Sequence, residues 1–169
     1  TAVGVSALGV QTNSSGADTF NTAIGFLAAS AVTTGTLNTA VGALALGAAT
    51  VNNRCTAVGY AALSAHNNTS TATTDNTAVG ANAGAAVTTG VQNTLIGALA
   101  GDALTDADFN KVTTADNNTF VGLSAGQSVT SGANNTLIGS ICADSMQTNT
   151  EMTAVGYNLA ATSQTGRAR

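Results

Sequence analysis

The chain has 169 residues, enough for one ordinary domain or one rod of stacked repeats, and only 7% of them are charged, against roughly a quarter in a typical soluble domain. The net charge is −4 with only four Lys and Arg residues, which excludes a cationic surface for nucleic acid. Proline and tryptophan are absent and aromatic residues make up 4%, so we expect small residues, not large side chains, to fill most of the interior.

The unit Asn-Thr-Ala-(Val or Ile)-Gly, with some replacements, organises the whole chain. Its threonine recurs nine times, at positions 1, 22, 39, 56, 77, 94, 119, 136 and 153. The step from Thr22 to Thr39 is the basic period of the repeat. Three steps between successive threonines are longer because they contain insertions: positions 1 to 22, 56 to 77 and 94 to 119. Thr1 already lies inside a copy and is not Met, so we expect a mature product or an excerpt of a longer protein, from which a targeting segment could have been lost.

Each copy predicts a short strand, because Thr and Val favour extended backbone and the closing glycine can take positive φ at a corner. The basic seventeen-residue period suffices for two short strands and two turns, which make one coil of a parallel β-solenoid. Stacked coils bring equal positions together about 4.8 Å apart. We therefore predict an all-β fold, a single parallel β-solenoid (β-roll) domain over residues 1–169, with about nine coils that begin near residues 1, 22, 39, 56, 77, 94, 119, 136 and 153.

Side chains alternate along a strand, which puts Thr and Val on one face and Asn and Ala on the other. The asparagines are expected to stack as an amide ladder that Cys55 and Met152 interrupt; they are Asn21, Asn38, Asn76, Asn93, Asn118 and Asn135. Both faces are partly apolar, so we expect a neighbouring chain to cover one of them. A homotrimer of parallel rods would do this with closed symmetry.

The uncharged residues 19–53 are not predicted to span a membrane, because Asn, Thr and Gly recur among them and no continuous apolar run of about 20 residues occurs.

The three longer steps between successive threonines, which we call the long intervals, predict surface loops at residues 10–18, 64–75 and 102–116. Within the longest loop, Asp106, Asp108 and Asn110 alternate like the first ligands of a calcium loop. Lys111 stands where such a loop needs Gly, and Asn117 stands where it needs Glu. A solvated loop is therefore the preferred interpretation, and no metal site is predicted.

The sequence contains no arrangement of residues that predicts an active site. His66 falls in the loop at 64–75 with no Cys or carboxylate beside it, and one histidine alone makes neither a triad nor a zinc site. No Gly-x-Ser-x-Gly motif and no phosphate-binding loop occurs. We predict no catalytic, cofactor-binding or metal-binding residues, and we do not expect an enzyme.

Cysteine and asparagine residues could carry covalent modifications, as disulfides and as glycosylation sites. Cys55 and Cys142 lie four coils apart, about 19 Å, which is beyond disulfide reach, so we expect buried free thiols or pairing between chains. Asn-x-Ser/Thr triplets predict glycosylation if the source can glycosylate, although they also arise by chance in so Asn- and Thr-rich a chain. They begin at Asn13, Asn67, Asn68, Asn117 and Asn134.

The unit Asn-Thr-Ala-Val-Gly resembles the repeats of trimeric autotransporter adhesin heads. The segment CTAVGYAAL, residues 55–63, is similar to repeats in the tail-fibre and adhesin shafts of bacteriophages and bacteria. This resemblance implies a left-handed parallel β-roll, a trimer and a role in attachment. The period of this chain is longer than that of the adhesin heads.

The repeats and loops together favour a structural and adhesive extracellular fibre or shaft, of the tail-fibre or surface-adhesin type, on a cell surface or a virion. Its loops would contact a surface glycan or a host receptor. One alternative is a self-assembling extracellular filament subunit. Another is an ice-binding solenoid, suggested by the threonine column, although a flat ice-binding array would need two parallel threonine rows.

Overall fold

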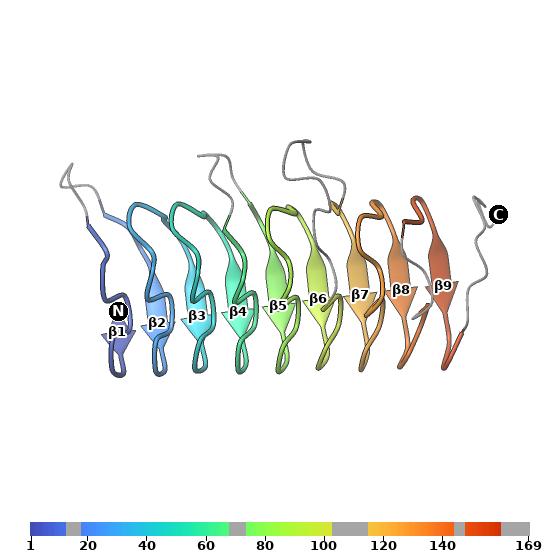
Figure 1. The fold of residues 1–169 in the computed structure, drawn as a ribbon, viewed down its shortest axis with the longest axis horizontal. Helices are drawn as coiled ribbons and strands as arrows, with labels where there is room; N and C mark the ends of the chain where they lie inside the picture. The colour runs from blue at the N-terminus through green and yellow to red at the C-terminus, as the bar shows by residue number, and fades with distance from the viewer. Residues whose placement is uncertain (13–17, 68–73, 103–114, 144–147, 160–169) are drawn as a thin grey trace.

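The computed structural model describes residues 1–12, 18–67, 74–102, 115–143 and 148–159. These residues form one sheet of nine parallel strands in chain order and no helix. The strands are β1 (Ala2–Val3), β2 (Thr22–Ile24), β3 (Thr39–Val41), β4 (Thr56–Val58), β5 (Thr77–Val79), β6 (Thr94–Ile96), β7 (Thr119–Val121), β8 (Thr136–Ile138) and β9 (Thr153–Val155). They are stacked along the axis of a rod, with β1 and β9 at opposite ends (Figure 1). The predicted parallel β-solenoid is confirmed.

Equal positions of the repeat lie in register along the rod. Thr39 pairs with Thr56 across one basic period of the repeat. Thr94 pairs with Thr119 in the same way, although the longest interval of the chain separates them. The long intervals therefore add residues without shifting the strands, and the threonines form one file from end to end.

An asparagine directly before the strand is buried in six of the nine repeats and links neighbouring coils. Asn38 donates its backbone N–H to Oδ1 of Asn21 at 2.8 Å, and its own Oδ1 accepts the N–H of Cys55 at 2.9 Å. Its Nδ2 donates across the coil to the carbonyl of Asn52 at 2.7 Å. The expected ladder exists, but most of its bonds join a side chain to backbone. Direct amide-to-amide bonds occur from Asn118 to Asn93 and from Asn135 to Asn118, both at 3.1 Å.

The prediction of two strands per coil is wrong for the described residues, which contain one strand in each repeat. The segment after the glycine forms consecutive turns, in which Leu44 and Leu46 have φ of 62° and 51°. Leu44 donates its N–H to Phe26 in the preceding coil, and Leu46 donates to Ala62 in the following one. These bonds between coils satisfy the backbone as a second strand would, and they hold leucine in a conformation that it rarely adopts alone.

The glycine that closes each strand is required by the stacking of the coils. Gly42 has φ of 131°, and a Cβ there would collide with the carbonyl of Gly59 in the next coil. A side chain at this position would therefore force neighbouring coils apart.

The core alternates large and small residues between the strand and the turn segment. In two neighbouring coils the strand supplies Ala40 and Ala57 while the turns supply Leu46 and Leu63. Further along the rod the strand supplies the larger side chain and the turn position is glycine or alanine, as in the pair Phe120 and Gly126. Small residues, chiefly alanine, fill most of the interior, as predicted, and one larger side chain from either the strand or the turn completes several of the coils.

Residues 19–53 form strands and turns. In the part of the chain that the structure describes, no helix has the length and apolar character for such a crossing.

Candidate interaction surface

The side of the sheet that faces away from the core carries one column of apolar residues, and the turns that follow the closing glycines carry a second column, apolar except at Ser140. The first column is the Val or Ile at the end of each strand, with Ile24 at 42% exposure and Val155 at 65%. The second column begins one residue after the closing glycine, where Phe26, Tyr60 and Tyr157 are exposed. We call these two columns the outer apolar face. Its members are Val3, Ile24, Val41, Val58, Val79, Ile96, Val121, Ile138 and Val155, with Val5, Phe26, Ala43, Tyr60, Ala81, Ala98, Leu123, Ser140 and Tyr157.

The strands generate this face because their register is constant. Outward side chains come from every second residue, so the Val or Ile of each repeat falls in one file. The threonines form a second outward file, half-buried from β2 to β8. Valine or isoleucine, not a second threonine, stands beside each of them. The two threonine rows of a flat ice-binding array are therefore absent from the nine described strands.

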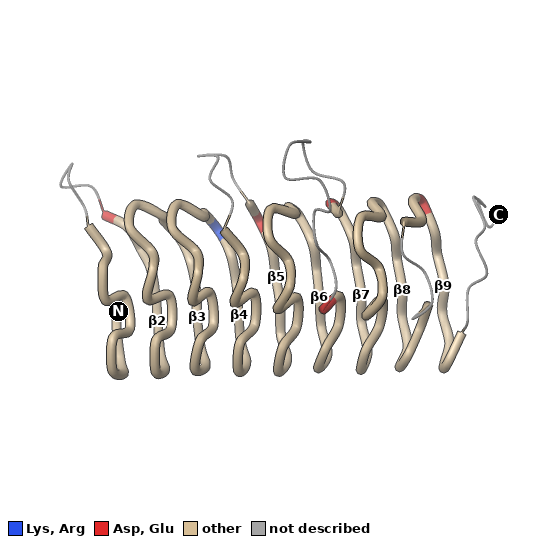
Figure 2. The backbone as a smooth tube through the Cα atoms, viewed as in Figure 1, with Lys and Arg blue, Asp and Glu red and all other residues tan. Residues whose placement is uncertain are grey.

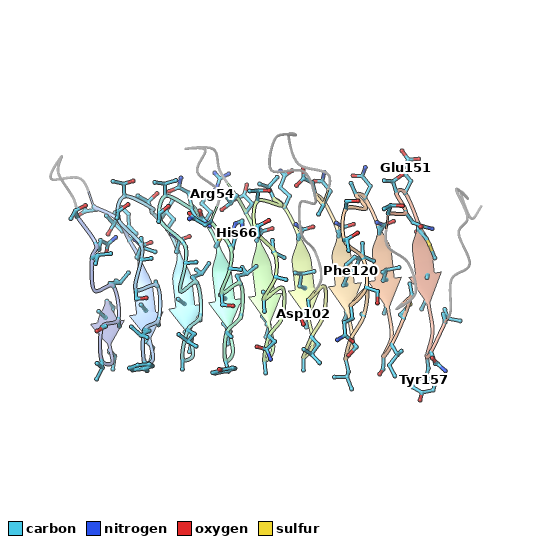
Figure 3. All side chains as sticks on the ribbon, in the orientation of Figure 1. Arg54, His66, Asp102, Phe120, Glu151 and Tyr157 are labelled. Atoms are coloured by element: carbon cyan, nitrogen blue, oxygen red, sulfur yellow. The ribbon has the colours of Figure 1, made fainter. Side chains whose placement is uncertain are left out.

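The outer apolar face contains no charged residue. Three of the six described charged residues, Arg54, Asp75 and Glu151, lie on the column directly before the asparagine column. We call it the corner column, and its members are Phe20, Leu37, Arg54, Asp75, Gln92, Asn117, Asn134 and Glu151. Figure 2 shows charged positions along one edge of the rod, with a further acidic one lower down near β6. In Figure 3, Arg54 and Glu151 lie on that edge and Tyr157 lies on the opposite edge.

Arg54 and Asp75 join neighbouring coils at the corner column. Nε and Nη2 of Arg54 contact the two carboxylate oxygens of Asp75 at 2.7 and 2.8 Å. Both side chains are substantially exposed, so solvent screens the pair and it adds little to stability. The hydrogen bond from Arg54 to Asp75 raises the pKa of Arg54 above its ordinary value.

The predicted loops are described only in part. Their middle portions, and with them Asp106, Asp108 and Asn110 of the candidate calcium loop, lie outside the described residues. Within the described ranges, no group of three or more His, Cys, Asp or Glu residues is arranged to hold a metal ion. Asp116, at the end of the longest interval, accepts the N–H of Val91 at 2.7 Å.

The placement of His66 in a surface loop is wrong, since the structure buries it completely. It follows Val32 and Ala49 at the basic spacing of the repeat and takes the core position that Val87 holds in the next coil. The signal was present in the spacing of this column. The inserted residues begin directly after His66, so the sequence alone does not separate it from the loop.

Cys55 and Cys142 are free and buried, as predicted. Burial raises the pKa of both thiols. Cys55 occupies the asparagine column, where its sulfur lies 2.9 Å from Oγ1 of Thr74 and accepts the N–H of Asn76. It thus replaces the amide oxygen that the other coils supply.

The predicted glycosylation positions differ in exposure. Asn117 and Asn134 are exposed and lie on the corner column. Asn67 is half-buried, and its Oδ1 accepts a hydrogen bond from Thr50 at 2.7 Å. Asn13 and Asn68 lie outside the described residues. Accessibility therefore favours Asn117 and Asn134 as acceptors.

Comparisons with protein-family models, with curated proteins and with solved structures find no match. Function must therefore be inferred from the rod and its outer apolar face.

Proposed function

We propose that this chain is the shaft of an extracellular fibre, on a cell surface or a virion, in which copies of the chain pack through the outer apolar face. One observation carries the proposal: an uncharged apolar surface extends over all nine strands, while the described charges lie elsewhere. Monomeric proteins rarely expose large contiguous apolar patches. The cores of protein interfaces are depleted of charge in the same way.

A parallel homotrimer is the assembly we favour. In parallel copies, each repeat lies at the same position along the rod axis. The Val or Ile column of one chain would therefore contact the same column of the neighbouring chain. Three rods around one axis would cover one face of each rod with closed symmetry. The resemblance of the repeat to trimeric adhesin heads agrees with this choice.

Attachment to a surface glycan or a host receptor is assigned to the residues of the long intervals. The described residues at the ends of these intervals lie on the corner column or within two residues of it, as at Asp18, Asp75 and Asp116. That edge lies opposite the one that carries Tyr157 (Figure 3). Association through the outer apolar face would leave the corner column accessible, in keeping with the division of repeat proteins into scaffold and binding loops.

Native mass spectrometry and analytical ultracentrifugation at micromolar concentration test the assembly. Three chains of 16.3 kDa would give about 49 kDa. The variant Val79→Lys/Ile96→Lys should be monomeric with an unchanged circular dichroism spectrum, because two outward charges would be buried at the interface. Gln92→Lys, on the exposed corner column, is the matched control and should remain trimeric. A wild-type chain that stays monomeric would refute the proposal.

A self-assembling filament is the second candidate, favoured by the end strands. Among the described strands, β1 and β9 stand at the two ends of the sheet, and the edge of a sheet can pair with a strand of another chain. Electron microscopy of the purified chain separates the two candidates. Short rods of uniform length favour the shaft, and long fibrils of single-rod width favour the filament.

A further inference from the structure

His66 is a polar side chain in an otherwise apolar core column. It is fully buried, and the equivalent positions in other coils are Val32, Ala49 and Val87. Its backbone is fixed on both sides: the N–H donates to Leu63 at 3.1 Å, and the carbonyl accepts Nδ2 of Asn52 at 3.0 Å. Figure 3 places the residue inside the coil of β4, toward the edge that carries Arg54.

Both ring nitrogens have partners, and the partners determine the tautomer. Nδ1 lies 2.9 Å from the carbonyl oxygen of Thr88, which can only accept, so Nδ1 carries the proton. Nε2 lies 3.0 Å from Nδ2 of Asn76 and accepts from it. The buried ring is therefore neutral, with no free position for a second proton.

Asn76 cannot turn to accommodate that proton. Its Oδ1 accepts the N–H of Asn93 at 2.9 Å, and its Nδ2 also donates to Gly90 at 2.7 Å. Reversing the amide would break both bonds and place two acceptors face to face. The asparagine ladder is already modified at this point, because Cys55 occupies the preceding position of the column.

We propose that His66 makes the junction of β4 and β5 an acid-sensitive point of the rod, at which a proton bound to Nε2 expels the ring from the core and opens the junction locally. Protonated Nε2 would point a donor at the amide donor of Asn76 and would place a positive charge in an apolar column. Neither conflict can be relieved while the ring stays in place, because Asn76 is held by the next coil. The proposal is independent of the fibre role.

No neighbouring charge among the described residues compensates a buried imidazolium. The charged groups closest in sequence are Arg54 and Asp75, which pair with each other at the exposed corner column. The thiol of Cys55 is buried and engaged with Thr74. From the coil of β5 the ring meets the Thr88 carbonyl and the Asn76 amide, and neither of these partners is a carboxylate.

The direction of the pH dependence follows from burial. Burial lowers the pKa of His66 from 6.5 to about 4. The open state therefore binds more protons than the closed state between these values, so the junction is fully stable above about pH 6.5 and weakens as the pH falls toward 4. With these two values the opening constant rises about 20-fold from pH 7 to pH 5.

Hydrogen exchange of backbone amides, corrected for intrinsic rates, measures this opening at pH 7 and pH 5. The reporting amides bridge the two coils: Thr56 to Asn76, Gly80 to Val58, and Asn67 to Thr88. Gly139, bonded to Val121 near the other end, is the internal reference. His66→Val supplies the residue that the column holds at Val32 and Val87, and His66→Gln supplies a polar side chain that does not titrate.

The expected result is a loss of protection of about 20-fold at the junction amides of the wild type, little change at Gly139, and no comparable loss in either variant. If the wild type and both variants change equally between pH 7 and pH 5, or if protection falls equally along the whole rod, the proposal is overturned. His66→Gln keeps the test decisive if His66→Val does not fold.

Discussion

The ring of Phe120 occupies the space that a side chain at position 126 would need: a Cβ on Gly126 would lie 2.5 Å from Cε2 of Phe120. In the coil of β4 the sizes are reversed, and Ala57 on the strand accompanies Leu63 on the turn. Both turn positions have similar backbone, with φ of 61° at Gly126 and 50° at Leu63. Strand and turn thus share one interior volume, which either of them can fill.

This relationship predicts a compensating exchange. Phe120→Ala should lower the free energy of unfolding by about 3–5 kcal/mol, because it leaves a cavity. Gly126→Leu alone should also destabilise the rod, since Phe120 occupies the space. The double variant Phe120→Ala/Gly126→Leu reproduces the arrangement of Ala57 and Leu63 and should recover most of the loss, to within about 1.5 kcal/mol of the wild type.

Urea unfolding followed by circular dichroism measures this double-mutant cycle. The exchange of volumes would be disproved if the two losses simply added. The pair Ala57 and Leu63 serves as the internal precedent, so no new backbone conformation is required.

The buried asparagines should contribute more to the free energy of unfolding than the exposed asparagines beside them. Oδ1 of Asn118 accepts the N–H of Asn135 at 3.0 Å, and its Nδ2 donates to Gly132 at 2.9 Å. Asn118→Ala removes both partners from buried backbone groups and should cost about 2–4 kcal/mol of unfolding free energy. Thermal and urea unfolding provide the measurement.

Asn117→Gly is the matched control for that substitution. Asn117 is exposed with φ of 56°, a conformation that glycine adopts without strain. Its effect should stay within about 0.5 kcal/mol. Equal effects of the two substitutions would mean that the asparagine column does not stabilise the stack.

The sequence predicted the file of threonines because one unit recurs and parallel stacking is the arrangement that puts its copies together. The pairing of Thr39 with Thr56 follows from the basic period alone. The pairing of Thr94 with Thr119 required the further assumption that extra residues leave the stack undisturbed, and it also holds.

The turn segment could not be predicted in the same way. Leu44 and Leu46 carry no turn signal, since leucine rarely adopts positive φ. Hydrogen bonds to the coils on either side impose that conformation, and such bonds appear only once the stack exists. The burial of His66 could not be predicted for a different reason: the inserted residues begin directly after its column, and the sequence does not mark where the coil ends and the loop starts.

The longest interval should be removable without loss of the fold. Val112-Thr113-Thr114-Ala115 repeats the pattern of Val87-Thr88-Thr89-Gly90, so deleting residues 104–111 returns the spacing of Thr94 and Thr119 to the basic period of the repeat. Shortening a loop changes the closure entropy by only about 0.6 kcal/mol per halving. The circular dichroism spectrum and the urea midpoint should therefore stay nearly constant.

The same deletion also tests attachment. Under the proposed function it should weaken binding to host surfaces or to a glycan array while the oligomeric mass is kept. Deleting residues 93–100 instead removes β6 and should destroy the cooperative unfolding transition. Unchanged attachment after deletion of each of the three long intervals would show that these residues do not carry the binding.

The two thiols should be almost unreactive in the folded chain. Cys55 and Cys142 are fully buried, and burial raises the pKa of each, so the thiolate fraction at pH 8 is below that of an ordinary cysteine. Pulsed alkylation with iodoacetamide at pH 8, followed by mass spectrometry, should give rates below about 1% of those in urea. Cys142→Ser isolates the signal of Cys55, and Cys55→Ser isolates that of Cys142. Rapid alkylation of either thiol in native buffer, or a disulfide-linked dimer on a non-reducing gel, would contradict their place inside the coils.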